Sequence, residues 1–192
     1  MPVTINGDGS ITGLAAGGLP SSALTGAIPS STLPAGTVIQ CVTDTTTART
    51  DNNGNTYLTI SGLSVTMTPR AANSKFYAIF EGHFYVDYGG SGSNAAHGIG
   101  YNIYKDGTRF TTSPNDSGGG ENSERPYDWY NDGAHRTVAR LMKTGQGTFG
   151  STSAATFTVK FKAYYANSQY TVRLNESGSE TQAQLTVMEI AV

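Results

Sequence analysis

The chain has 192 residues, which is enough for one domain or for one domain with an appendage. Only 14% of its residues are charged and 24 are glycine, a composition that favours short strands joined by turns over helices. The 12 basic residues are outnumbered by 14 acidic ones, which argues against nucleic acid as a partner, and no apolar run reaches the ~18–20 residues of a membrane span.

Residues 1–36 show neither helical nor strand periodicity, and Asp8 is the only charged residue before position 44. Aliphatic side chains are spaced through this segment, but their burial is too small to offset the entropy of ordering it alone. A disordered linker is the alternative, although such linkers are usually rich in charge. We expect an extended attachment and trimerisation arm at 1–36, followed by a head domain at 37–192. The assembly contacts expected in the arm are Ile5, Ile11, Leu14, Leu19, Leu24, Ile28 and Leu33.

After the arm, apolar and polar residues alternate with a period of two, which predicts strands with one buried face. The first clear example is Leu63, Val65 and Met67, and a longer strand follows at 76–86. The second face of this longer strand is too apolar for plain exposure to solvent, which indicates burial between subunits. Its first face consists of Phe76, Ala78, Phe80, Phe84 and Val86, and its second of Tyr77, Ile79, Glu81, His83 and Tyr85.

Several further strands are expected beyond position 98. Ile99, Tyr101 and Ile103 lead into Asp106-Gly107, a pair that predicts a tight hairpin because glycine tolerates the positive φ of a primed turn. Alternation at 157–165, 170–174 and 184–192 predicts three more strands. The sequence therefore predicts an all-β head, an antiparallel β-sandwich of jelly-roll type, with no helix.

An insert at 111–135 is much longer than a hairpin requires, and it holds the only tryptophan of the chain. Aromatic rings stack on the apolar faces of sugars, and neighbouring carboxylates accept hydrogen bonds from hydroxyls. The alternative is that these rings pack at the end of the sandwich or at a subunit interface. The candidate ligand-binding residues are Tyr127, Asp128, Trp129, Tyr130 and Asp132.

The common catalytic and nucleotide-binding motifs are absent from the sequence, so we predict that the protein is not an enzyme. The alternative is a glycosidase, because such enzymes need only two carboxylates and the insert supplies several. His135 lies near Asp128 and Asp132 without a spacing that fixes a ligand geometry, so neither a metal nor a cofactor is expected. The single cysteine, Cys41, excludes an internal disulfide framework, and we expect it to be a small buried hydrophobe.

The order of several segments resembles tailed-bacteriophage fibre-like proteins. At the N-terminus the resemblance lies in GSITGL at 9–14, GGLP at 17–20 and LPAGTVIQ at 33–40. It continues in GLSVTMTP at 62–69 with Ser74-Lys75, and closes with ATFTVKF at 155–161 and LTVMEIAV at 185–192. This resemblance implies a virion structural protein, a homotrimer with an N-terminal attachment arm and a β-sandwich head. The distal head often binds the host in this family, but no binding residue can be carried over by motif.

These observations predict a structural bacteriophage protein located on the virion, on the tail or on the capsid surface. The leading hypothesis is a trimeric tail-fibre-like component whose distal head binds host surface glycans. One alternative is a capsid decoration or cement protein that stabilises the particle through its arm, and another is a free carbohydrate-binding module. The expected partners are two further copies of the chain, other virion proteins at the arm, and host polysaccharide, without nucleic acid or membrane insertion.

Overall fold

The computed structural model describes residues 4–5, 11–12, 33–88, 99–110, 123–124, 135–163, 170–175 and 181–192. Its contacts divide the chain into two compact units, Met1–Leu33 and Pro34–Val192. In the first unit, β1 (Thr4–Ile5) pairs antiparallel with β2 (Ile11–Thr12), so that Ile5 lies opposite Ile11. Among the described residues no helix is long and apolar enough to cross a membrane.

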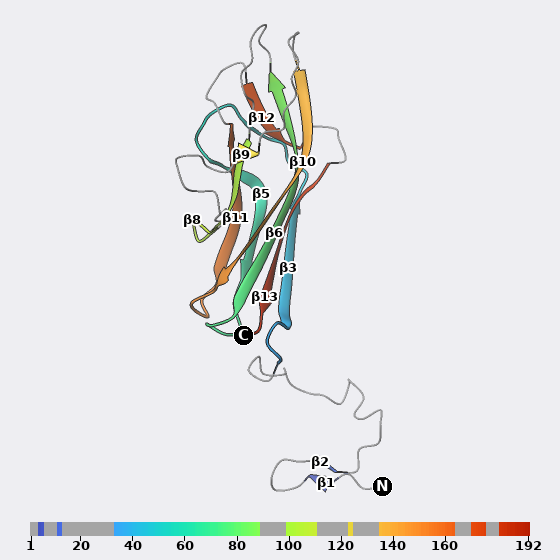
Figure 1. The fold of residues 1–192 in the computed structure, drawn as a ribbon, viewed down its shortest axis with the longest axis vertical. Coiled ribbons are helices and arrows are strands. Elements are labelled where there is room, and N and C mark those ends of the chain that lie inside the picture. Colours follow the sequence, from blue (N-terminus) through green and yellow to red (C-terminus); the bar gives the residue numbers. More distant parts are fainter. Residues whose placement is uncertain are drawn as a thin grey trace. The chain divides into compact units, whose positions relative to one another are not determined.

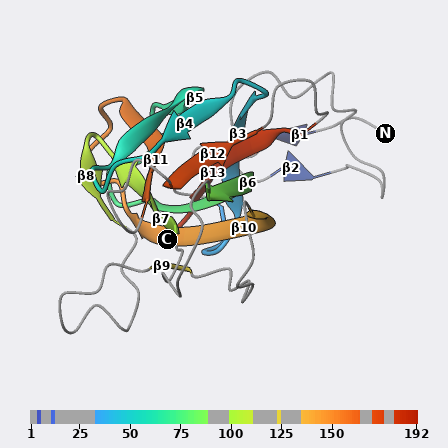
Figure 2. The ribbon, with the colours of Figure 1, turned by 90° about the horizontal axis from the view of Figure 1, so that it is seen from above.

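The second unit is all-β and consists of two antiparallel sheets that face each other (Figures 1 and 2). The six-stranded sheet contains β3 (Val38–Thr46), β4 (Thr50–Asn52), β6 (Lys75–Tyr88), β10 (His135–Thr148), β12 (Tyr170–Leu174) and β13 (Ala183–Ile190). The five-stranded sheet contains β5 (Leu58–Met67), β7 (Ile99–Lys105), β8 (Thr108–Arg109), β9 (Ser123–Glu124) and β11 (Ala155–Ala163). The predicted antiparallel β-sandwich is confirmed.

The chain alternates between the two sheets in the manner of a jelly roll. The six-stranded sheet runs in the order β3-β13-β6, with β10 on the far side of β6, while the other sheet runs in the order β5-β11-β7. Successive long strands therefore lie in opposite layers, and β13 inserts between β3 and β6, which are distant from it in the sequence. This topology brings the last strand of the chain to the middle of the larger sheet.

The core lies between the sheets, and the predicted strand faces form it. Leu63, Val65 and Met67 of β5 and the first face of β6 are buried, as the alternation predicted. In β11 every second residue from Ala155 to Ala163 is buried. Phe76 lies at the centre of an aromatic cluster, with ring centroids 4.9 Å from Phe110, 5.1 Å from Phe157 and 5.3 Å from Phe149.

The predicted hairpin at Asp106-Gly107 is confirmed. Both residues have positive φ, 50° and 80°, and the flanking Lys105 and Thr108 pair across the turn. This is the geometry of a type I′ turn, whose twist matches that of the strands. The Asp106 carboxylate also accepts a hydrogen bond from the Thr156 amide at 2.8 Å, which lowers the pKa of Asp106 and links this turn to β11.

Candidate functional site

The predicted sugar-contact residues of the insert lie outside the described part of the chain, and so do most of the arm contacts. Tyr127, Asp128, Trp129, Tyr130 and Asp132 are not described, nor are Leu14, Leu19, Leu24 and Ile28. Leu33 is half-buried, and Ile5 is the register partner of Ile11 in the β1–β2 pair. The roles assigned to these residues stay predictions.

The outward face of the six-stranded sheet carries the best-defined candidate site. Its central strand, β6, is flanked along one side by β10 over its whole length. Along the other side β13 pairs with it as far as Glu81, and β12 pairs with it from Phe84 onward. The sheet thus changes neighbours at Gly82 and His83, and this break leaves room for a hollow in an otherwise continuous surface.

A surface cavity of about 460 Å³ lies at this break. Strand β6 supplies Glu81 and His83, and β10 supplies Arg140, which is the cross-strand partner of His83. The start of β13 supplies Gln184, the cross-strand partner of Glu81, and the residues that precede the strand complete the wall. The full lining is Glu81, His83, Arg140, Thr181, Gln182 and Gln184, all of them polar.

An ion pair between Glu81 and Arg140 crosses the cavity. The Arg140 side chain is 67% exposed and that of Glu81 is 34% exposed, so the pair is open to solvent. Such exposed pairs contribute little to folding stability. Gln184 is exposed as well, and its amide donates to the Thr186 hydroxyl at 3.1 Å. The lining therefore presents charged and neutral hydrogen-bonding groups at a surface whose packing does not depend on them.

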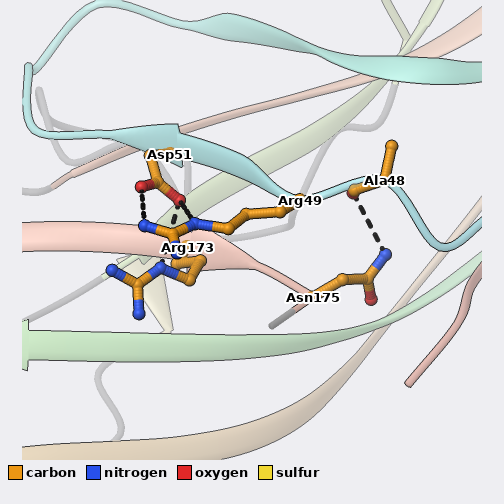
Figure 3. Close-up of polar contacts among 5 residues, drawn as sticks. All are labelled: Ala48, Arg49, Asp51, Arg173 and Asn175. Atoms are coloured by element: carbon orange, nitrogen blue, oxygen red, sulfur yellow. Dashed lines mark hydrogen bonds and ion pairs between the residues drawn. The ribbon is translucent and has the colours of Figure 1, made fainter. Parts of the chain in front are cut away.

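The buried residue Asn175, which directly follows β12, holds the backbone of the lining residue His83. Its backbone has a left-handed φ of 52°, and its N–H donates to the carbonyl oxygen of His83 at 3.1 Å. Its side-chain amide donates to the carbonyl oxygen of Thr46 at 3.0 Å and to that of Ala48 at 3.4 Å, the second of which is drawn in Figure 3. Asn175 therefore fixes the break in the sheet to the connection between β3 and β4. Its Oδ1 is buried without a hydrogen-bond partner, as is the hydroxyl oxygen of Thr50.

Two arginines flank one carboxylate on the same face, further along β12 (Figure 3). Arg49 donates to both oxygens of Asp51, at 2.9 and 2.5 Å, and Arg173 donates to one of them at 3.1 Å. The hydrogen bond from Arg49 lowers the pKa of Asp51, partial burial opposes the shift, and the charge of Arg173 supports it. Arg173 lies opposite Tyr85 in the sheet, so this group, with one net positive charge, shares the outward face with the cavity.

The other end of the outward face is more apolar. Cys41, Met188 and Tyr77 form one row across β3, β13 and β6. Tyr77 and Met188 are half-buried, and Ile79 and Ile190 are half-buried beside them. Cys41 is exposed, so the expectation that it is a buried hydrophobe was wrong. The reason is that β3 presents position 41 on the outer surface, opposite Met188.

The described lining does not contain the paired carboxylates of a glycosidase. A glycosidase of the usual kind needs two carboxyl groups on either side of the scissile bond. Among the described residues of the lining, Glu81 is the single carboxylate, and it is paired with Arg140. No group of three or more histidine, cysteine, aspartate or glutamate side chains able to hold a metal ion occurs in the described residues.

Sequence reasoning predicted none of these six residues to bind a ligand, although it placed three of them on strands. It placed Glu81 and His83 on the outer face of β6, and it predicted the strand that carries Gln184. It missed Arg140 because it did not predict β10 at all, and it missed Thr181 and Gln182 because they precede a strand without any motif. The chain matches no protein-family model, and a search of the curated proteins finds no similar sequence.

Proposed function

We propose that the protein is a structural component of a bacteriophage virion, of trimeric tail-fibre-like type. Residues 1–36 attach it to the particle, and the β-sandwich heads associate and present a surface to host glycans. The support from the sequence is the resemblance of the quoted segments to fibre-like proteins and the nearly uncharged N-terminal segment. The support from the fold is the jelly-roll head, which forms a unit separate from Met1–Leu33.

The observation that carries the proposal is the apolar row on the outward face of the larger sheet. An antiparallel sheet with one face on the core normally turns polar residues to the solvent on the other. Here Cys41, Met188 and Tyr77 lie side by side on that face, with Ile79 and Ile190 next to them. Cys41 is exposed and the other four are half-buried, and apolar side chains gathered in this way on an outward face are typical of a protein interface. In a homotrimer, a second copy of the head would cover this apolar row.

The solution mass of the full chain tests the association. Light scattering after size exclusion would be run on residues 1–192 and on the compact unit Pro34–Val192. A trimer in both cases places the association in the heads, as proposed. A trimer with the full chain alone would transfer that role to the arm, and a monomer in both cases would overturn the homotrimer and favour a free carbohydrate-binding module.

Position on the particle separates the tail-fibre role from the decoration role. The spaced aliphatic residues of the first unit suit packing against a capsid as well as against a tail. Antibody labelling of virions in electron micrographs would show the head on the tail for a fibre component. Labelling over the capsid, together with loss of capsid heat stability when residues 1–33 are removed, would replace the fibre role with that of a cement protein.

A further inference from the structure

We infer that the cavity at the break in the six-stranded sheet is a glycan-binding site, which takes one hydroxyl-rich sugar unit of a polysaccharide. The site is distinct from the insert at 111–135, where the sequence predicted ligand contact. The inference rests on the proposed function only in naming the host surface as the source of the glycan. Binding itself is a property of the isolated protein and is measured without the virion.

The donor and acceptor chemistry of the lining matches sugar hydroxyls. A hydroxyl both donates and accepts, so it is bound best by groups that offer both functions. The side-chain amides of Gln182 and Gln184 offer both, as does the Thr181 hydroxyl, while Glu81 accepts and Arg140 donates. A fully apolar ligand would displace the water around these groups and offer them no hydrogen bonds, which costs binding free energy.

The charges of the lining disfavour ligands, such as phosphate, whose binding would rest mainly on ion pairing. The one carboxylate and the one guanidinium of the cavity are already paired with each other. A phosphate would compete with Glu81 for Arg140 and would meet the carboxylate at close range. A neutral sugar can accept from Arg140 and donate to Glu81 without separating the two charges.

One apolar side chain lies beside the polar groups, as a sugar site requires. Met142 is the cross-strand partner of Glu81 on β10, and 61% of it is exposed. A pyranose ring has an apolar face of C–H groups, and the flexible thioether of methionine adapts to such a surface. Ring hydroxyls can then reach Glu81 and Gln184 while the C–H face covers Met142.

The site is built on rigid elements. Glu81 and His83 belong to the central strand of the sheet, and the His83 carbonyl is held by the Asn175 amide at 3.1 Å. Arg140 and Gln184 occupy register positions in the strands on either side. The backbone at these positions is fixed before a ligand binds, so little of its conformational entropy is lost on binding, and this favours affinity.

A glycan array tests the inference with the full chain. The array would carry lipopolysaccharide O-antigens and capsular polysaccharides, with neutral members and members that bear uronate or phosphate. We expect binding to neutral polysaccharides that persists at high salt. The absence of any binding, or binding confined to phosphate-bearing glycans and abolished by salt, would overturn the inference.

Variants then locate the site by calorimetric titration with an oligosaccharide from the best polysaccharide on the array. We expect Gln184→Ala and Glu81→Gln to weaken binding by about tenfold each, because the first removes an amide that meets a hydroxyl and the second replaces a charged acceptor with a weaker neutral one. Thr144→Ala is the matched control, since Thr144 is exposed on the same outward face but lies outside the lining, and it should leave affinity unchanged. Loss of affinity in Trp129→Ala with none in Gln184→Ala or Glu81→Gln would overturn the inference and favour the insert.

This experiment separates the inference from the proposed function. A protein that binds glycans through the cavity but is absent from virions would keep the site and refute the virion assignment. A protein that is found on virions but binds no glycan would keep the virion assignment and refute the glycan site. Circular dichroism and thermal unfolding of each variant confirm that a loss of affinity is not a loss of fold.

Discussion

Gly147 lies directly opposite Phe76 in the β6–β10 ladder, and the Phe76 ring occupies the space that a side chain at position 147 would need. A Cβ built on Gly147 would lie 2.6 Å from Cζ of that ring and 2.9 Å from Cε1. The same ring is the centre of the aromatic cluster at this end of the core. Because position 147 is glycine, the Phe76 ring can pack against the backbone of β10 at this position.

Gly147→Ala should destabilise the head for this reason. The added methyl group must displace the Phe76 ring or the backbone of β10, and overpacking of this kind costs roughly 1–3 kcal/mol. The free energy of unfolding in urea would measure the loss. Thr144→Ala, at an exposed position on the same strand, is the control and should change stability by less than about 0.5 kcal/mol. Equal effects of the two substitutions would contradict the packing argument.

The same pair explains why β10 could not be predicted from the sequence. Its inward positions include Lys143, Gly145 and Gly147, which give no apolar alternation. The strand forms because β6 offers a complete row of backbone partners, and the Phe76 ring of β6 fills the space left by Gly147. Strands β5, β6 and β11, by contrast, carry their own alternation, so the sequence was sufficient to predict them. Arg140 could be assigned to the site only once the pairing of β10 with β6 was known. The cavity could be recognised only once the break between β12 and β13 was known.

Glu189 is a fully buried carboxylate whose role is structural. It accepts hydrogen bonds from the Gln40 amide at 2.6 Å and from the backbone amides of Arg70 at 2.9 Å and Ala71 at 3.3 Å. Glu189→Ala would leave these donors buried without an acceptor, and we expect a loss of about 2–3 kcal/mol in the free energy of unfolding.

Glu189→Gln serves as its partner variant, because the amide keeps one oxygen to accept a hydrogen bond. Its cost should be clearly smaller than that of the alanine variant when both are unfolded in urea. If both variants were as stable as the wild type, water would be accepting these hydrogen bonds in place of the carboxylate. Glu189 would then have no structural role.

Asp51 should make the stability of the head depend on pH in the acid range. Its pKa lies below the ordinary aspartate value of 3.8, chiefly because of the hydrogen bond from Arg49. A lowered folded-state pKa stabilises the fold fully above the unfolded pKa, and the contribution is lost as pH falls through the folded pKa. The side chain is 38% exposed, so solvent screening limits the effect to less than about 1 kcal/mol.

The measurement is urea unfolding of the wild type and Asp51→Asn at pH 7 and at pH 3. We expect a stability difference at pH 7 that shrinks at pH 3. In a double-mutant cycle with Arg49→Gln at pH 7, the coupling should be favourable and should weaken in high salt. A difference between wild type and variant that grows on acidification would contradict the sign of the pKa shift.

Cys41 supplies an internal probe of the proposed subunit interface, because it is the only cysteine, it is exposed, and it lies opposite Met188. We expect a maleimide to label it slowly at concentrations where the protein is assembled and faster on dilution to the monomer. Tyr77→Glu should abolish this protection, since a charge beside Met188 would have to be buried in the assembled state.

The control is a Cys41→Ser protein with a cysteine at Thr66, an exposed position on the five-stranded sheet. Its labelling rate should not depend on protein concentration, because that face takes no part in the proposed contact. Rates for Cys41 that stay constant across the range in which light scattering detects assembly would show that the apolar row stays open. The chains would then associate through another surface of the head or through the arm. The apolar row would not be the contact between subunits.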